Sequence, residues 1–223
     1  MKSFFITGTD TGVGKTRFTL ELMQYYKNQD MRVAGMKPVA TGSVNSSAGY
    51  RNEDALAILA CCSRPEVYED INPYALIDPV APIIAARREN RKISRERIIR
   101  SYKKLQEQAD LIVVEGVGGW RVQLGEDFML AELVAQLQMP IVLVVGLRLG
   151  CINHALLSVE GICNDGLELC GWVANSIDPD FSGWEDYLHL LQEAISVPML
   201  AYMPYTEAGT DTAILWQDID RLY

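Results

Sequence analysis

The sequence lacks the paired metal ligands of zinc proteins and the cysteine pairs of disulfide-rich proteins. Its five cysteines form no Cys-x-x-Cys pair, and its two histidines, His154 and His189, have no paired-ligand spacing. Reduced, mostly buried thiols in an intracellular protein are therefore the simplest interpretation. No apolar run approaches the roughly 18 residues of a membrane span, and Thr7 and Asp10 interrupt any signal-peptide core. We expect a cytoplasmic protein without membrane contact.

Positive charge is also scarce in this chain. The 20 lysines and arginines face 29 aspartates and glutamates, which gives a formal net charge of -9. Nonspecific nucleic-acid binding is disfavoured, because it depends on neutralising phosphates with basic side chains. Any polyphosphate ligand needs a locally arranged positive site against this overall field. With 223 residues, 49% of them hydrophobic, the chain is long enough for one domain, residues 1–223, with a substantial core.

Short apolar runs alternate with longer amphipathic segments. Several runs are apolar throughout, as expected for strands of a parallel sheet that is covered on both faces. We expect strands at Phe4–Thr7, Val33–Met36, Leu111–Val114, Ile141–Val145, Gly171–Ala174 and Met199–Tyr202, and helices near 15–29, 53–61, 94–108, 127–138, 151–164 and 184–195. This alternation predicts a single α/β domain with a mostly parallel sheet and helices on both faces.

The stretch GTDTGVGKT, from Gly8 to Thr16, has the composition of a phosphate-binding loop. It follows an expected strand and opens an expected helix, so its backbone N–H groups and the helix dipole can hold an anion. Five residues separate Gly8 from Gly14, where the usual pattern has four. Lys15 is placed to reach the β- and γ-phosphates of a nucleotide, and the Thr16 hydroxyl is placed to bind Mg²⁺. A chance glycine turn is the weaker alternative.

An apolar run that ends in a glutamate has the form of a Walker B strand. Four apolar residues, Leu111–Val114, end at Glu115, and Gly116, Gly118 and Gly119 follow. A carboxylate at this place is a ligand that Mg²⁺ prefers, and the glycines allow a ligand to approach the backbone closely.

Two further charged residues lie near the ends of predicted elements. Asp54 stands at the start of a helix and is either a second Mg²⁺ ligand or merely a helix cap. Lys37 follows the second strand, at the edge where open α/β sheets bind ligands, although a lone lysine is usually solvated.

The irregular segments 41–52 and 72–82 either shape a ligand site or are surface excursions. Three prolines exclude a long helix from the second of them.

These motifs together resemble the dethiobiotin synthetase family over essentially the whole chain. The resemblance rests on GTDTGVGKT (8–16), KPVATGS (37–43), RNEDAL (51–56), NPY (72–74), VVEGVGGW (113–120), VVGLRLGCINHALL (144–157) and GWVANS (171–176). The longer loop spacing is the form that this family uses. The resemblance implies a P-loop NTPase-like fold and a homodimer with its substrate site near the subunit interface. The implied reaction converts 7,8-diaminononanoate, CO₂ and ATP into dethiobiotin, ADP and phosphate through a carbamate and a carbamic–phosphoric anhydride.

The resemblance also implies roles for residues of this sequence. The implied catalytic residues are Lys37, Lys15 and Thr11, and the implied Mg²⁺ ligands are Thr16, Asp54 and Glu115. Substrate contacts are implied for Thr41, Gly150, Cys151, Asn153 and Tyr187, the last being the weakest candidate. ATP, as co-substrate, is implied to contact Gly12, Val13, Gly14, Lys15, Thr16, Arg17, Asp54, Glu115, Gly116, Val117, Gly118, Asn175, Ser176, Pro204, Tyr205 and Thr206. Some relatives carry glutamate at position 12, so Gly12 is expected to bind only through its backbone.

Three alternatives follow from parts of the pattern. A partitioning-type regulatory ATPase normally has a lysine where this chain has Asp10. A cobyrinate-type amide ligase normally carries a glutamine-hydrolysing domain, for which 223 residues leave no room. Asn175 and Asp178 have the spacing by which GTPases read guanine, but the second residue of that motif is Ser176 instead of lysine. We therefore expect ATP, with some tolerance for other nucleotides left open.

Overall fold

A computed structural model of the protein describes residues 2–207 and 213–222. Its centre is a seven-stranded sheet in the order β11-β10-β9-β8-β1-β7-β2. All neighbouring strands are parallel except β10 and β11, which are antiparallel. The strands are β1 (Lys2–Gly8), β2 (Val33–Met36), β7 (Leu111–Glu115), β8 (Ile141–Leu147), β9 (Leu169–Ser176), β10 (Met199–Met203) and β11 (Leu215–Trp216).

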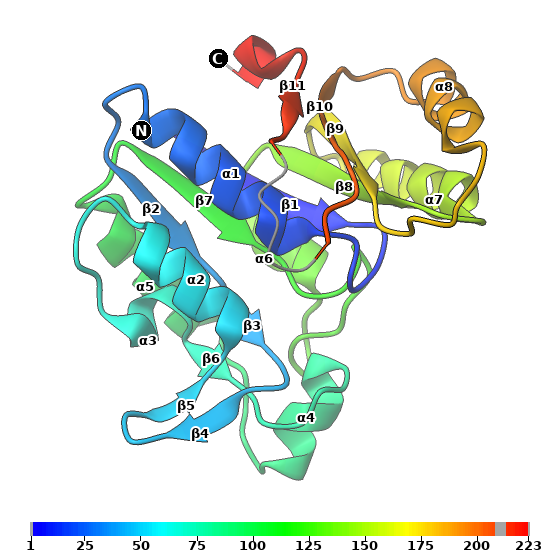
Figure 1. Cartoon of the computed structure of the whole chain (residues 1–223). Helices are drawn as coiled ribbons and strands as arrows, with labels where there is room; N and C mark the ends of the chain where they lie inside the picture. Colours follow the sequence, from blue (N-terminus) through cyan, green and yellow to red (C-terminus); the bar gives the residue numbers. More distant parts are fainter. Residues whose placement is uncertain (1, 208–212, 223) are drawn as a thin grey trace.

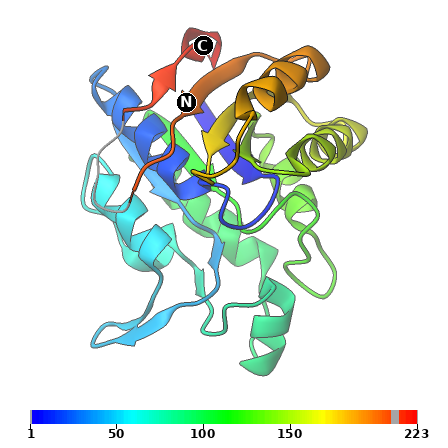
Figure 2. The same ribbon diagram turned by 45° about the vertical axis from the view of Figure 1, so that its right-hand side comes forward.

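Two small sheets lie outside this main sheet. One pairs β3 (Val39–Ala40) with β6 (Tyr74–Ala75) in parallel, and the other is the hairpin of β4 (Val44–Ser46) and β5 (Gly49–Arg51). Figures 1 and 2 show the hairpin and helix α4 extending from the end of the main sheet where β2 and β7 finish.

Helices cover both faces of the main sheet. In Figure 1, α1 and α2 lie in front of the sheet and α5 and α6 lie behind it, while α7 packs against β8, β9 and α8. The helices are α1 (Lys15–Lys27), α2 (Glu53–Cys61), α3 (Tyr68–Ile71), α4 (Pro82–Arg88), α5 (Arg95–Gln106), α6 (Leu130–Leu137), α7 (Cys151–Asn164) and α8 (Trp184–Ala194), with a 3₁₀ turn at Ile219–Leu222. The doubly covered architecture that the sequence predicts is confirmed.

The side chains of β1 point alternately to the two faces of the main sheet and pack into a core on each face. Phe4 stacks on Tyr26 of α1, with ring centroids 6.3 Å apart, whereas Phe5 meets the edge of Trp120 at 6.4 Å. Successive strand residues point to opposite faces, so these two neighbours anchor two different layers. Every residue of β7 and β8 is buried, as expected for parallel strands between helical layers.

The strands and helices expected from sequence are all present, and most differ from the structure by a few residues at their ends. The expected helix at 127–138 is wrong at its start, because Gln123 bridges Met129 and α6 begins only at Leu130. The segments 41–52 and 72–82 are also more ordered than their composition indicates. They contribute β4, β5 and β6, and α4 begins at Pro82, where a missing N–H costs nothing.

Each of the five cysteines is free of a disulfide bond, and Cys163 is exposed on α7. Within residues 2–207 and 213–222, no helix combines the length and the apolar character needed to cross a membrane.

Gly35 tests how tightly the sheet packs against its front layer. A Cβ at this position of β2 would lie 2.4 Å from Cγ2 of Ile58 on α2 and 2.8 Å from Sδ of Met23 on α1. We expect Gly35→Ala to lower the free energy of unfolding by about 1–3 kcal/mol, because the core must shift to admit the methyl group. Urea denaturation measures this loss.

The control for this prediction is the same change in an Ile58→Ala background. Removal of the Ile58 side chain frees the space, so Gly35→Ala is expected to cost less there than in the wild type. An equal cost in both backgrounds would show that the contact with Ile58 is not the cause.

Candidate active site

The phosphate loop, the end of β7 and the segments after β2 surround one cavity of about 330 Å³. Its walls combine residues that are far apart in sequence but meet at the carboxyl ends of β1, β2 and β7, where open α/β sheets bind ligands. The lining residues are Thr11, Gly12, Gly14, Lys15, Thr16, Lys37, Ala40, Thr41, Asn52, Asp54, Glu115, Val117 and Gly118. The structure thus brings the expected catalytic, metal and phosphate-loop residues to one place.

The phosphate loop depends on glycine at two of its positions. Gly12 and Gly14 have φ angles of 75° and 93°, which side-chain-bearing residues rarely adopt. A Cβ on Gly14 would also lie only 2.2 Å from Nδ2 of Asn175. That same amide group donates a hydrogen bond of 2.9 Å to the carbonyl of Val13. The loop is therefore fixed against β9, which lies two strands away from β1 in the sheet.

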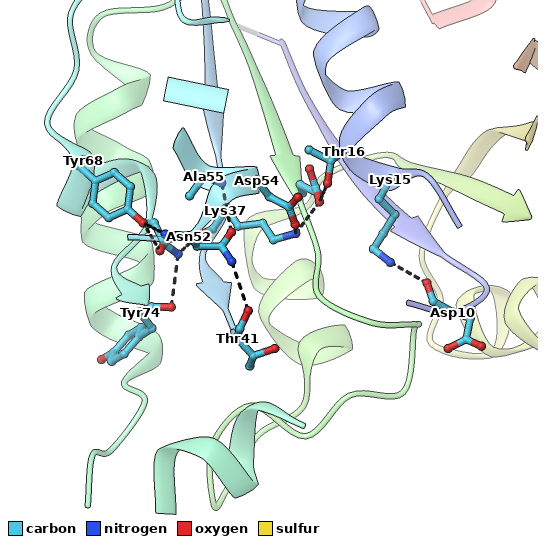
Figure 3. A network of polar contacts seen from close by, with 12 residues as sticks. Asp10, Lys15, Thr16, Lys37, Thr41, Asn52, Asp54, Ala55, Tyr68 and Tyr74 are labelled. Carbon is cyan, nitrogen blue, oxygen red and sulfur yellow. Dashed lines mark hydrogen bonds and ion pairs between the residues drawn. The ribbon is translucent and has the colours of Figure 1, made fainter. Parts of the chain in front are cut away.

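Asp10 organises the loop by three contacts. Its carbonyl accepts a hydrogen bond of 2.7 Å from the Lys15 ammonium, as Figure 3 shows. Its carboxylate accepts the N–H of Thr11 at 2.7 Å and the guanidinium of Arg148 at 2.6 Å, and both contacts lower the pKa of Asp10. Burial, together with the positive charge of Lys37, lowers the pKa of Lys15 to about 8.

Lys37 lies between two carboxylates in the deepest part of the site. Its ammonium is 2.9 Å from Oδ2 of Asp54 and 2.5 Å from Oε1 of Glu115, and the Thr16 hydroxyl donates to the same Glu115 oxygen at 2.8 Å. Lys37 is 4% exposed and Glu115 is 1% exposed. The other oxygen of Glu115, Oε2, is buried and has no hydrogen-bond partner among the described residues. Figure 3 shows this group of side chains.

The charges of this group stabilise one another. Burial alone would lower the pKa of Lys37, but the carboxylates of Glu115 and Asp54 outweigh it and raise the pKa. Burial would likewise raise the pKa of Asp54, yet the ammonium of Lys37 holds it below its usual value. The raised pKa of Lys37 and the lowered pKa of Asp54 keep both side chains charged at neutral pH, because each gains an oppositely charged partner.

Asp54 is not the cap of its helix. Asn52 is the N-cap residue of α2, and its side chain accepts the N–H of Ala55 at 3.2 Å. The capping alternative for Asp54 is therefore wrong, and its carboxylate is directed to Lys37 instead.

The residues expected around the nucleotide base lie at the ends of β9 and β10. Asn175 is buried, and its Oδ1 has no hydrogen-bond partner within residues 2–207 and 213–222. Arg17 donates to the carbonyl of Pro204 at 2.8 Å, and so does the Thr206 hydroxyl at 3.3 Å. The side chain of Ser176 is engaged elsewhere, in a 2.8 Å hydrogen bond with the hydroxyl of Tyr202. The remaining expected residue here, the aromatic residue at position 205, is 40% exposed.

The residues expected to hold the substrate carboxylate lie apart from the cavity. None of the four (Gly150, Cys151, Asn153 and Tyr187) lines it. The N–H of Cys151 donates to the carbonyl of Arg148 at 3.0 Å, so this group is already used inside the turn. The ring of Tyr187 packs against Phe181, with centroids 4.8 Å apart. Gly150 cannot cap α7 with a side chain, and that helix start is therefore open to an anion.

Two expected contacts also lie behind the cavity wall. Gly116 packs against Phe5, and a Cβ added at Gly116 would lie 2.9 Å from the Phe5 ring. The side chain of Val13 is buried.

Sequence reasoning missed the roles of Asn52 and Arg148. Each lies within a quoted motif, RNEDAL or VVGLRLGCINHALL, but only the structure shows which partners these side chains contact.

The donor set fits Mg²⁺ that is bound largely through phosphates. Two carboxylates and one hydroxyl converge, from Asp54, Glu115 and Thr16. No group of three or more histidine, cysteine or acidic residues that could hold a metal occurs in the part of the chain that the structure describes. Mg²⁺ commonly takes only one or two protein carboxylates and completes its shell with water and substrate phosphates.

Solved structures resemble this fold at low sequence identity. One is the septum site-determining protein MinD complexed with Mg-ADP from Pyrococcus horikoshii OT3, with a TM-score of 0.58 and 16% identity over 91% of this chain and 81% of that chain. Another is the signal recognition particle receptor FtsY from Elizabethkingia anophelis, with a TM-score of 0.53 and 12% identity. It matches 99% of this chain, which corresponds to 64% of that structure. At such identities the likeness concerns the fold alone.

Sequence relatives are far more similar. The AAA domain family matches residues 2–212. The ATP-dependent dethiobiotin synthetase of Xylella fastidiosa (strain Temecula1) is 46% identical over 96% of this chain and 95% of its own length. That of Cellvibrio japonicus is 46% identical over 99% and 97%, and that of Pseudomonas aeruginosa is 46% identical over 96% and 94%. The similarity is thus end to end and includes the whole cavity, and the chain belongs to the family of ATP-dependent dethiobiotin synthetases.

Proposed function

We propose that this protein closes the ureido ring of dethiobiotin from 7,8-diaminononanoate, CO₂ and ATP, with ADP and phosphate as the other products. One observation supports this proposal most directly. Lys15 from the phosphate loop and Lys37 from the end of β2 line the same cavity in a chain of net charge -9. Two convergent cations are what a reaction between two anions requires.

The proposed chemistry has three steps. An amine of the substrate adds to CO₂ and loses a proton, which gives a carbamate. A carbamate oxygen then attacks the γ-phosphorus of ATP, and the bond to the ADP oxygen breaks. The second amine attacks the carbonyl carbon of the resulting anhydride and loses a proton, the ring closes as the C–O bond breaks, and phosphate leaves with the former carbamate oxygen.

Lys15 and Lys37 stabilise the negative charge that accumulates as the carbamate approaches the triphosphate. Such a transfer needs mainly positioning and electrostatic stabilisation. Thr11 and Thr41 line the same cavity, and a threonine hydroxyl can offer a hydrogen bond to the carbamate.

Thr16, Asp54 and Glu115 are the residues that would hold Mg²⁺. The unpartnered buried oxygen of Glu115 fits such a ligand. Mg²⁺, when bound there, supplies positive charge beside the β- and γ-phosphates. A cation held there would share both carboxylates with the Lys37 ammonium, whose own charge faces the anions in the cavity.

Asn175 favours an adenine base. One N–H of its side-chain amide donates to the carbonyl of Val13, and the amide oxygen is a buried acceptor without a partner among the described residues. The exocyclic amine of adenine can donate to this oxygen, whereas guanine offers a second acceptor at the same position. Asp178, the other part of a guanine-reading pattern, is exposed and accepts the N–H of Asp180.

We further propose that the whole chain forms one domain and acts as a cytoplasmic homodimer. Gly150, Asn153 and Tyr187 do not line their own cavity, and they are available to the substrate of a second copy. Two large apolar side chains next to this segment support an interface there, since Leu149 is 80% exposed and Leu157 is 59% exposed.

Turnover tests the proposed reaction directly. With ATP and Mg²⁺, we expect ADP release to depend on both diaminononanoate and bicarbonate. Lys37→Met is expected to lower kcat by about 10²–10³-fold, as is typical when one electrostatic contact to the reacting charge is removed. ADP binding, measured by calorimetry, is expected to persist because the phosphate loop is intact.

Lys103→Met, a change of an exposed lysine on α5, is the matched control and should turn over like the wild type. ADP release by the wild type that ignores the diamine would refute the proposed reaction. Full turnover by Lys37→Met would remove Lys37 from the mechanism.

The expected metal site can be tested with Mn²⁺ as a spectroscopic substitute for Mg²⁺. In nucleotide-free protein, Lys37→Met is expected to bind Mn²⁺ at least about tenfold more tightly than the wild type, about 1.4 kcal/mol. The physical reason is that Asp54 and Glu115 lose the ammonium that neutralises them. Electron paramagnetic resonance of free Mn²⁺ measures the difference.

Two variants test the cause. Lys15→Met should gain less affinity, since the Lys15 ammonium contacts a carbonyl and not these carboxylates. Addition of Glu115→Gln to Lys37→Met should abolish the gain. Equal Mn²⁺ affinity in Lys37→Met and the wild type would show that the metal does not use this place.

A further inference from the structure

Three buried polar residues form a continuous chain of hydrogen bonds that leads away from the cavity, which Asn52 lines. Asn52, Tyr68 and Asn72 are 8%, 7% and 2% exposed. The hydroxyl of Tyr68 accepts the N–H of Asn52 at 2.8 Å and donates to Oδ1 of Asn72 at 3.0 Å. Figure 3 shows Asn52 and Tyr68 of this chain beside Lys37 and Thr41.

Asn72 holds the backbone of Lys37. Its amide nitrogen donates to the Lys37 carbonyl at 2.7 Å, and the preceding residue, Ile71, accepts the N–H of Lys37 at 2.8 Å. Both backbone polar groups of Lys37 are therefore fixed by two neighbouring residues. The position of Cα of Lys37 decides where its ammonium can reach.

Asn52 holds two other parts of the site. Its Oδ1 caps α2, the helix that carries Asp54, and its Nδ2 donates to the carbonyl of Thr41 at 3.2 Å. One side chain thus ties the helix of an expected metal ligand to the segment of an expected substrate contact.

The Tyr68 hydroxyl joins these two amides. Because it donates to Oδ1 of Asn72, it turns the NH₂ group of that amide toward Lys37. Without the hydroxyl, the N–H of Asn52 and the Oδ1 of Asn72 would lose this partner in a buried place.

We propose that Asn52, Tyr68 and Asn72 are positioning residues. They hold Lys37, Thr41 and Asp54 in the relative positions that the reaction requires. This inference rests on the proposed ring-closing function. Tyr68 and Asn72 do not line the cavity, and all three residues act through the groups they hold. A displacement of about 1 Å at a reacting group can cost about 10²-fold in rate, so a backbone hydrogen bond to Lys37 has catalytic consequences.

The test compares two Tyr→Phe variants, each of which loses a buried phenolic hydroxyl. Tyr68→Phe removes the hydroxyl of the chain. Tyr74→Phe removes a hydroxyl that accepts the N–H of Ser94 at 2.8 Å, and Tyr74 is 3% exposed. We expect similar losses in Tm for both variants. Only Tyr68→Phe is expected to lower kcat, by about tenfold or more, while KM for ATP and ADP affinity stay within about twofold.

Two variants of Asn52 distinguish its role as the cap of α2 from its role in positioning Thr41. Asn52→Ser keeps an oxygen that can cap α2 but loses the donor to Thr41. It is expected to retain Tm and to lose activity at limiting diamine, and Asn52→Ala is expected to lose both. Full activity in Asn52→Ser would overturn the role assigned to its contact with Thr41.

Amide NMR shifts give a readout that does not depend on activity. The signals of Lys37, Thr41 and Asp54 are expected to move in Tyr68→Phe and to stay in place in Tyr74→Phe. Equal kcat in the two variants, with unmoved amides, would overturn the inference. A wild type without diamine-dependent ADP release would refute the proposed function instead, and the amide shifts would then decide alone whether the network positions these residues.

Discussion

The ion pairs of Lys37 with Asp54 and Glu115 are the interactions on which the rest of the site depends. A buried ammonium or carboxylate is costly to desolvate, and the buried Lys37 and Glu115 offset this cost by pairing with each other, with the half-buried Asp54 as a second partner of Lys37. The protein carries a net charge of -9 and yet must bind a triphosphate. The cluster resolves this conflict locally, because the ammonium of Lys37 is held charged inside the cavity by the two carboxylates.

The fold supplies this cluster from three directions. Parallel strands that end at one edge bring Lys37, which follows β2, beside Glu115, the last residue of β7. Helix α2 adds Asp54, and the phosphate loop adds Thr16 after β1. The pairing of β3 with β6 holds the segment after Lys37 against residues 74–75, so the segment 72–82 serves as a support for the cavity wall rather than as part of it.

Much of this arrangement follows from local patterns. Apolar runs that end in Glu115 or Lys37, and the glycine spacing before Lys15, predict which groups gather at the carboxyl edge of a parallel sheet. Other features have no local signal. The fit of Gly14 against Asn175 joins residues on distant segments, and so does the pair of Asp10 and Arg148. Asp54 could have been a helix cap by sequence alone, and the choice of Asn52 depends on backbone geometry at the start of α2.

Transfer of the γ-phosphoryl group of ATP to a carbamate oxygen can be followed with CO₂ labelled with ¹⁸O. The label is supplied with ATP and diaminononanoate, and the released phosphate is examined by ³¹P NMR before the label exchanges with water. We expect one labelled oxygen in each inorganic phosphate formed with dethiobiotin. Dethiobiotin formed together with unlabelled phosphate would exclude this transfer, because the phosphoryl group would then have passed to water.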